Sequence, residues 1–149
     1  PHWRGRPLET GARARMQDHP LVRAVLGQGR RILARVVARL LELAALPQRI
    51  RDGTGESEAV AASAPGVGQA WVETARGLLL HRVEVLGEQV SRYQILAPTE
   101  WNFHPQGALA QALSGMRADT EPALRGKIAR ALLALDPCVG YAVTVLPHA

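Results

Sequence analysis

The sequence has 149 residues, 47% of them hydrophobic and only 4% aromatic, so it is long enough for one domain with a mainly aliphatic core. It contains no run of about 18 apolar residues, so no membrane span is expected. Its single cysteine excludes an internal disulfide and a zinc site built from cysteines alone. Residues 1–51 hold eleven arginines against three acids, and the rest of the chain is net acidic. The basic surplus indicates either a solvated helix face or a surface for an acidic partner.

A long amphipathic helix is predicted near the start of the chain, after an irregular lead-in over residues 1–19. Pro20 suits the first turn of this helix, and Pro47 is expected to end it. Apolar residues recur at three- and four-residue steps and are expected to form core, whereas Arg35 and Arg39 fall on the other, solvated side. The apolar positions are Val22, Val25, Leu26, Leu33, Val36, Val37, Leu40 and Leu43.

A change of composition follows this helix. Residues 52–70 are rich in small residues and are predicted to form a flexible loop or linker, with one short helical turn near residues 58–62. Two strand-like runs come next, at residues 78–85 and 90–96, and their side chains alternate between two faces. We expect an antiparallel hairpin, which needs cover from another strand or from a helix.

The last third of the chain is predicted to contain an irregular loop over residues 97–102, a short helix over 108–114 and a longer final helix. Thr120 can cap the final helix, and Asp136 is expected to end it because a residue before proline avoids helical geometry. Cys138 therefore lies just past a helix C-terminus. The elements together predict an α+β fold that is mostly helical, with one long N-terminal helix, a small antiparallel hairpin and a C-terminal helix. The length predicts a single domain over residues 1–149. Because the sequence does not begin with methionine, we expect it to be a fragment of a longer chain.

Four separated stretches carry short motifs in a fixed order. They are RPLETGARAR at residues 6–15, ETARG at 73–77 followed by His81, QILAPTEWN at 94–102, and DPC at 136–138. In order and spacing they resemble the C-terminal half of the large, metal-carrying subunit of nickel–iron hydrogenases. The resemblance covers most of the chain, and it implies the fold of that part of the large subunit.

The terminal motif departs from the family. In nickel–iron hydrogenases it reads Asp-Pro-Cys-x-x-Cys-x-x-His, and two Cys-x-x-Cys pairs hold the nickel–iron centre through four thiolates. Cys138 matches the first cysteine of this motif, but Tyr141 stands at the second cysteine and Thr144 at the histidine. The upstream cysteine pair is absent from this sequence. One thiolate cannot complete a site of four sulfurs, so nickel is not expected as a cofactor.

The surviving motif residues imply a pocket for iron. In the family an arginine and a Pro-Thr pair surround the cyanide ligands of the iron, and their counterparts are Arg76, Pro98 and Thr99. The resemblance implies that these three residues transiently bind an iron fragment with two cyanides and a carbonyl, Fe(CN)2CO, and that Cys138 is its metal ligand. A cyanide nitrogen accepts hydrogen bonds, for which a guanidinium or a hydroxyl is a suitable donor. The alternative for Arg76 is an ion pair with Glu73.

Four other residues of the motifs are interpreted as structural. Glu9 is expected to form an ion pair in the arginine-rich lead-in, and Trp101 is expected to lie in the core. Asn102 is predicted to satisfy backbone groups of a loop. His81 is predicted to be an ordinary strand residue.

Three functions of different class follow. The pattern resembles the degenerate large-subunit paralogues of the HupK/HoxV type, which are hydrogenase expression and formation proteins. This implies a non-catalytic cytoplasmic scaffold or chaperone, with no catalytic residues, whose partners are the immature large subunit and other maturation proteins. One alternative is a fragment of a nickel-dependent hydrogenase large subunit, which Tyr141 and Thr144 disfavour. The other is a basic helical protein-binding module with a vestigial metal pocket; nucleic acid is not expected as a partner.

Overall fold

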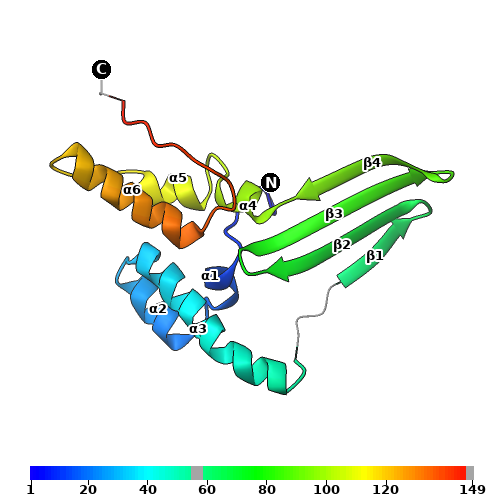
Figure 1. Cartoon of the computed structure of the whole chain (residues 1–149), viewed down its shortest axis with the longest axis horizontal. Coiled ribbons are helices and arrows are strands. Elements are labelled where there is room, and N and C mark those ends of the chain that lie inside the picture. Colours follow the sequence, from blue (N-terminus) through cyan, green and yellow to red (C-terminus); the bar gives the residue numbers. More distant parts are fainter. Residues whose placement is uncertain (55–58, 147–149) are drawn as a thin grey trace.

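A computed structural model of the chain describes residues 1–54 and 59–146. A helical body lies at one end of the molecule, and an antiparallel sheet projects from it (Figure 1). The predicted α+β class is confirmed. The helices are α1 (Ala12–Arg15), α2 (Pro20–Gly27), α3 (Arg31–Arg51), α4 (Pro98–Asn102), α5 (Ala108–Leu113) and α6 (Glu121–Leu135), and the strands are β1 (Ala59–Ala64), β2 (Val67–Thr74), β3 (Gly77–Leu86) and β4 (Gln89–Leu96).

The single long helix predicted after Pro20 is wrong, because the chain forms two helices there. Gly29 has a φ of 72°, a left-handed conformation that glycine adopts easily, and it separates α2 from α3. The predicted end at Pro47 is also wrong, since this proline lies inside α3. Its missing N–H removes one helical hydrogen bond. The last turn continues to Asp52, whose backbone N–H donates to the Gln48 carbonyl (2.9 Å) and whose carboxylate accepts from Gln48 Nε2.

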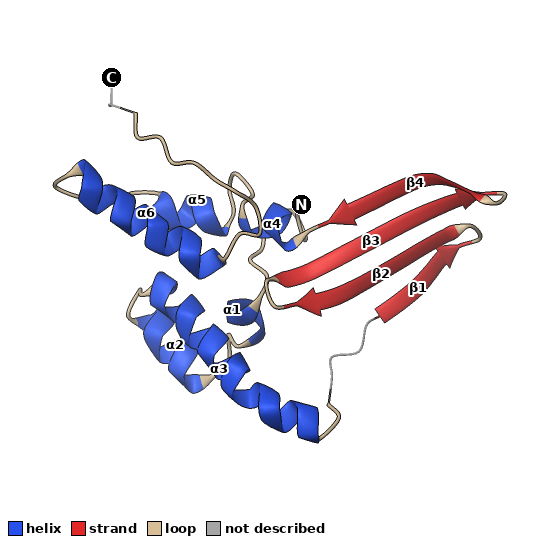
Figure 2. Ribbon diagram, in the orientation of Figure 1, coloured by secondary structure: helices blue, strands red, loops and turns tan. Residues whose placement is uncertain are grey.

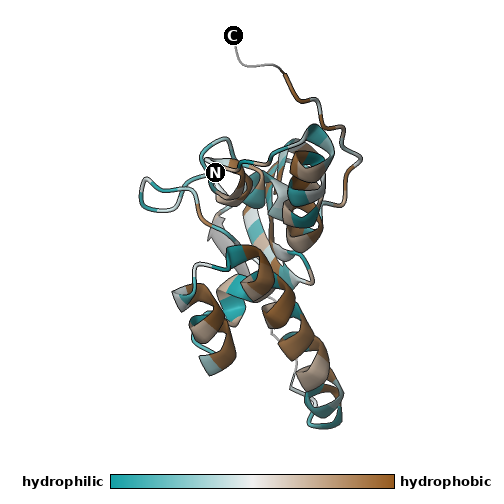
Figure 3. Cartoon of the chain, turned by 90° about the vertical axis from the view of Figure 1, so that its left-hand side faces the viewer, coloured by the Kyte–Doolittle hydropathy of each residue, from teal (hydrophilic) through white to brown (hydrophobic). Residues whose placement is uncertain are grey.

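The core of the helical body is built from small residues. Ala34 and Ala38 of α3 are fully buried and pack with Val22 of α2 and with Ala12 of α1. The prediction that the larger apolar residues of α3 form the core is wrong for four of them. These residues, Leu33, Val36, Leu40 and Leu43, are exposed. In the hydropathy colouring, much of the α3 ribbon is brown, the colour of hydrophobic residues (Figure 3).

The sheet has four strands in the order β1-β2-β3-β4, all antiparallel (Figure 2). Strands β3 and β4 are the predicted hairpin, closed by a two-residue turn at Gly87 and Glu88. The predicted loop over residues 52–70 is wrong from Ala59 onward, because β1 and the start of β2 occupy that range. The predicted helical turn near residues 58–62 is likewise strand from Ala59, and residues 55–58 lie outside the described residues. The alanine-rich sequence of β1 has no clear alternation of apolar and polar residues, so it gives no strand signal. The strand forms because it pairs with β2.

The last third of the chain follows the prediction more closely. Helices α5 and α6 are confirmed, and the Thr120 side chain caps α6 by accepting from the Ala123 backbone N–H (3.3 Å). Residues 98–102, predicted to be irregular, form the short helix α4. Asp136 ends α6 in the left-handed conformation, with φ of 52°. In the described part of the chain, no helix is long and apolar enough to cross a membrane.

Candidate functional site

Three of the four motif stretches interlock at the turn between β2 and β3. The Thr10 backbone N–H donates to Asn102 Oδ1 (2.9 Å), and Asn102 Nδ2 donates to the Thr10 carbonyl (3.2 Å). Thr10 Oγ1 accepts from the Leu78 backbone N–H (2.7 Å). Gly11 lies so close to the Arg76 backbone that a Cβ at this position would be 2.8 Å from the Arg76 carbonyl oxygen. The predicted structural role of Asn102 is therefore confirmed, since its amide pairs with both the backbone N–H and the carbonyl of Thr10.

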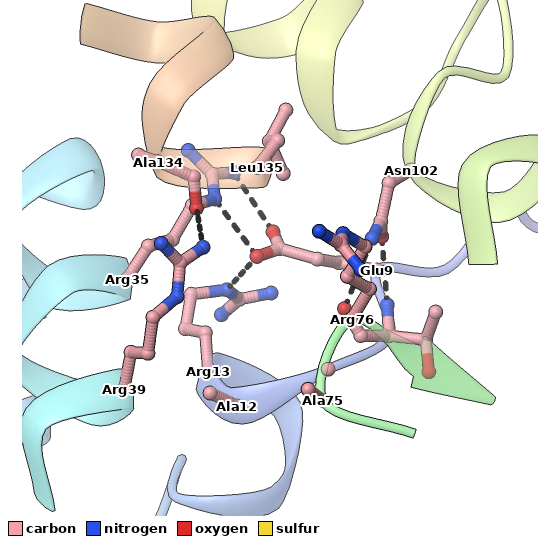
Figure 4. Close-up of a pocket in the computed structure, with 12 residues that line it drawn as sticks. Glu9, Ala12, Arg13, Arg35, Arg39, Ala75, Arg76, Asn102, Ala134 and Leu135 are labelled. Atoms are coloured by element: carbon pink, nitrogen blue, oxygen red, sulfur yellow. Dashed lines mark hydrogen bonds and ion pairs between the residues drawn. The ribbon is translucent and has the colours of Figure 1, made fainter. Parts of the chain in front are cut away.

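A buried ion cluster around Glu9 stands next to this junction (Figure 4). Arg35 donates to Glu9 through two parallel hydrogen bonds, from Nε to Oε1 and from Nη2 to Oε2, both 2.8 Å. Arg13 Nε forms an ion pair with Glu9 Oε1 at 2.7 Å. The side chains of Glu9 and Arg35 are only 8% and 5% exposed. The predicted ion pair of Glu9 is thus confirmed, whereas the predicted solvated position of Arg35 is wrong.

The electrostatics of this cluster favour a charged Glu9. Burial alone raises the pKa of this carboxyl, but the hydrogen bond from Arg35 and the attraction of Arg35 and Arg13 outweigh burial. The pKa of Glu9 therefore lies below its ordinary value. Such a buried pair is costly to break, because the remaining partner is left charged and unpaired. We call Glu9, Thr10, Gly11, Arg35 and Asn102 the buried frame.

The end of α6 is fixed to this region by two arginines. Arg39 Nη2 donates to the Ala134 carbonyl (3.1 Å), and Arg76 Nε donates to the Asp136 carbonyl (3.1 Å). Arg76 Nε also lies 3.3 Å from Asp136 Oδ2. Cations at a helix C-terminus bind carbonyls that lack helical partners and complement the negative end of the helix dipole. The fourth motif stretch is joined to the other three in this way.

The alternative partner predicted for Arg76 is wrong, because Glu73 is engaged by Arg15. Arg15 Nη1 lies 2.5 Å from Glu73 Oε2, and Arg15 Nε lies 2.6 Å from Glu42 Oε1. The hydrogen bond from Arg15 to Glu42 raises the pKa of the guanidinium, against the opposing effect of burial. This network links α1, α3 and β2 and leaves Arg76 free to bind the end of α6.

The predicted site residues differ in their surroundings. Arg76 is exposed at the turn between β2 and β3, and Cys138 is exposed with a free thiol. Pro98 is buried and Thr99 is half-buried in the first turn of α4. Within residues 1–54 and 59–146, no hydrogen bond or ion pair joins Arg76 to Thr99 or Cys138. The same residues contain no group of three or more His, Cys, Asp or Glu side chains that could together hold a metal ion.

A small cavity of about 20 Å³, enough for one water molecule, lies between the buried frame and the end of α6. Arg13, Arg35, Arg39 and Arg76 all line it. Of these four arginines, the sequence pattern predicts only Arg76 as a site residue. The Glu9–Arg13 pair has a local signal in its spacing of four residues. Arg35 has no such signal, because only the packing of α3 against the lead-in brings it to Glu9.

The class of protein follows from comparison with known families. Residues 27–144 match the family model of the nickel-dependent hydrogenases. The chain belongs to the nickel-dependent hydrogenase family.

Two similar proteins are named as hydrogenase expression/formation proteins. The chain is 37% identical to the hydrogenase expression/formation protein HupK of Rhizobium leguminosarum bv. viciae, over 97% of this chain and 40% of that protein. It is 38% identical to the hydrogenase expression/formation protein HoxV of Cupriavidus necator, over 96% of this chain and 39% of that protein. The chain thus spans about two fifths of the length of these curated relatives.

A solved structure of the family shares the fold. The Ni-Fe-Se hydrogenase from Desulfovibrio vulgaris Hildenborough, in its reduced state, superposes with a TM-score of 0.66 and 27% sequence identity. The match covers 93% of this chain and 36% of the hydrogenase chain. The predicted resemblance to the large-subunit family and to its HupK/HoxV branch is therefore confirmed.

Proposed function

We propose that the chain is part of a non-catalytic accessory protein for the maturation of nickel-dependent hydrogenases. It would serve as a scaffold or chaperone, in the cytoplasm, for assembly of the Fe(CN)2CO fragment or of the large subunit. Its partners would be the immature large subunit and other maturation proteins. The names of the two relatives with 37% and 38% identity support this proposal.

The observation that carries the proposal is a contrast within the motif stretches. The residues that hold the four stretches together are present and interact as a structural unit, from Thr10 and Asn102 to Arg76 and Asp136. Tyr141, which is 55% exposed, stands at the second cysteine of the family's terminal motif. A protein of this kind keeps the architecture around the metal site while lacking the ligands that would complete a nickel centre.

The cargo in this proposal is an iron fragment that binds transiently. Cys138 would supply one thiolate to iron, and the guanidinium of Arg76 would donate hydrogen bonds to a cyanide nitrogen. Thr99 would donate through its hydroxyl, and Pro98 would shape the wall beside it. Arg76 is exposed and fixed at its Nε by Asp136, so its remaining N–H groups are available to a bound group. In this proposal the protein does not bind nickel.

Infrared spectroscopy with iron and nickel analysis tests this proposal, using the full-length protein co-expressed with the maturation machinery. We expect carbonyl and cyanide bands with iron, and we expect their loss in Cys138→Ala. Arg76→Lys should shift the cyanide bands, because lysine lacks the planar fork of donors. Arg82→Lys is the matched control, since Arg82 lies on β3 and pairs with Glu84.

Two results would contradict the iron-carrying role. One is the absence of these bands from the full-length wild type under conditions that load a hydrogenase large subunit. The other is their persistence, unchanged, in Cys138→Ala. Stoichiometric nickel with hydrogen uptake would instead indicate an active hydrogenase.

A further inference from the structure

A second hollow, of about 400 Å³, lies on another side of the Glu9 cluster. It is formed by the segment before α1, by α1, by α2, by the start of α3 and by α5. Its polar lining consists of Glu9, Arg13, Arg31, Arg35 and Gln111. It shares Glu9, Arg13 and Arg35 with the small cavity, but neither Arg76 nor the end of α6 contributes to it. A volume of this size is in the range of small-ligand pockets.

The charges of this hollow do not balance. Three arginines face it and Glu9 is the only acid in its lining. Arg35 and Arg13 already engage both oxygens of Glu9. Arg31 is exposed at the mouth of the hollow, and its side chain has no hydrogen bond or ion pair to any residue within 1–54 and 59–146. The lining therefore has a surplus of positive charge that attracts an anion.

Arg35 supplies a second, independent indication. Its side chain is 95% buried, and its Nη1 has no hydrogen-bond partner among the described residues. Because Nε and Nη2 face the Glu9 carboxylate, the planar geometry of the guanidinium turns Nη1 away from Glu9. A buried donor that belongs to a charged group is rarely left unpaired. An anion bound at Nη1 would satisfy this donor without approaching Glu9 directly.

We propose that this hollow binds a small oxyanion, a carboxylate or a phosphate. Arg35 Nη1 would bind the anion at the buried end, and the exposed guanidinium of Arg31 would close over it from the mouth. Guanidinium groups bind both oxyanions through parallel hydrogen bonds. Gln111 Nε2 donates to the Gln106 carbonyl and has a second N–H for the ligand. The site goes beyond the proposed maturation function, and none of its residues belongs to the iron-binding set.

Calorimetric titration with inorganic phosphate and, separately, with acetate tests the site, at an ionic strength held constant with sodium chloride. The wild type should bind at least one of these probes saturably at a single site, and the tighter one identifies the class of ligand. Arg31→Gln should weaken binding about tenfold or more, because it removes a charged hydrogen-bond donor. Arg30→Gln is the matched control, since Arg30 does not line this hollow.

Further variants keep the test independent of folding and of the iron site. Arg35→Gln also breaks the pair with Glu9, so Gln111→Leu at the exposed mouth serves as the second variant and should weaken binding two- to threefold, roughly the effect of a neutral hydrogen bond of about 0.5 kcal/mol. Cys138→Ala should bind with wild-type affinity whether or not iron binding is lost. The proposal is overturned if the wild type binds neither probe saturably, or if Arg31→Gln and Arg30→Gln bind with equal affinity.

Discussion

The buried frame and the C-terminal tail, residues 136–146, differ sharply in this chain. Gly11, Arg35 and Asn102 of the frame are buried. Paired hydrogen bonds between Thr10 and Asn102 join segments far apart in sequence. The tail contains no helix or strand, and both Cys138 and Tyr141 are exposed in it. The motif residues in the frame form hydrogen bonds between segments, whereas Tyr141 in the tail stands where the family motif has a cysteine.

The largest expected effect breaks the frame at its ion cluster. Arg35→Ala should lower the free energy of unfolding by about 3–5 kcal/mol, because Glu9 is left charged and buried with one partner removed. Urea denaturation measures this change. Arg23→Ala, on the exposed side of α2, is the control and should change stability by less than about 0.5 kcal/mol. Equal effects of the two substitutions would show that the cluster contributes nothing special to stability.

The next effect concerns the link between α4 and the lead-in. Asn102→Ala removes both hydrogen bonds to Thr10 and leaves two backbone groups without their partners. We expect a loss of about 1–3 kcal/mol in the free energy of unfolding, measured in the same way. Gln17→Ala, an exposed position, controls for the loss of a side-chain amide. If the urea midpoint of Asn102→Ala equals that of the wild type, other contacts hold α4 to the segment around Thr10.

The third effect is a pH dependence that Glu9 imposes on the frame. The pKa of Glu9 is lowered in the folded chain from its ordinary 4.5, so the folded state binds this proton less tightly than the unfolded state does. The stability that Glu9 confers is therefore fully present above pH 4.5 and is lost as the pH falls through the lowered folded pKa. Urea unfolding between pH 7 and pH 3 should show a shallower acid loss in Glu9→Gln than in the wild type. An unchanged slope in Glu9→Gln would contradict the assignment.

The smallest effect is expected in the tail. Cys138→Ala should change the free energy of unfolding by less than about 0.5 kcal/mol, because the side chain is exposed and free. In the folded wild type, a thiol reagent should react with Cys138 nearly as fast as in urea. Strong protection of the thiol would show that the tail is packed, and it would remove the difference between tail and frame.

Local signals in the sequence predict the C-terminal elements well. The Thr120 cap and the Asp136-Pro137 stop act within a few residues, and α6 begins and ends where they place it. The hairpin of β3 and β4 has the same local character, since alternation and a short turn determine it. The motif resemblance likewise predicts the family, which the match of residues 27–144 confirms. Gly11 and Arg76, from two of these motifs, approach each other closely in the structure.

Features that depend on distant partners were not predictable from the sequence pattern. The apolar spacing in α3 predicts Leu40 and Leu43 as core, but both are exposed. The buried residues are Ala34 and Ala38, because their small side chains allow the helices to approach closely. Arg35 belongs to the same small-residue face and becomes buried because Glu9 meets it there. The break at Gly29 had a local signal, but the continuous periodicity on both sides outweighed it.

The two arginines that bind the end of α6 limit how far Cys138 can move from the frame. Arg39 and Arg76 come from separate elements and hold Ala134 and Asp136, so the point where the tail departs is fixed relative to the frame. Cys138 follows Asp136 by two residues, which span at most roughly 7 Å of extended chain. Its thiol is thus confined to a small volume even though the tail has no regular structure. Anything covalently or coordinately attached to it is held on a short tether, at a local concentration that a thiol on a long loop could not provide.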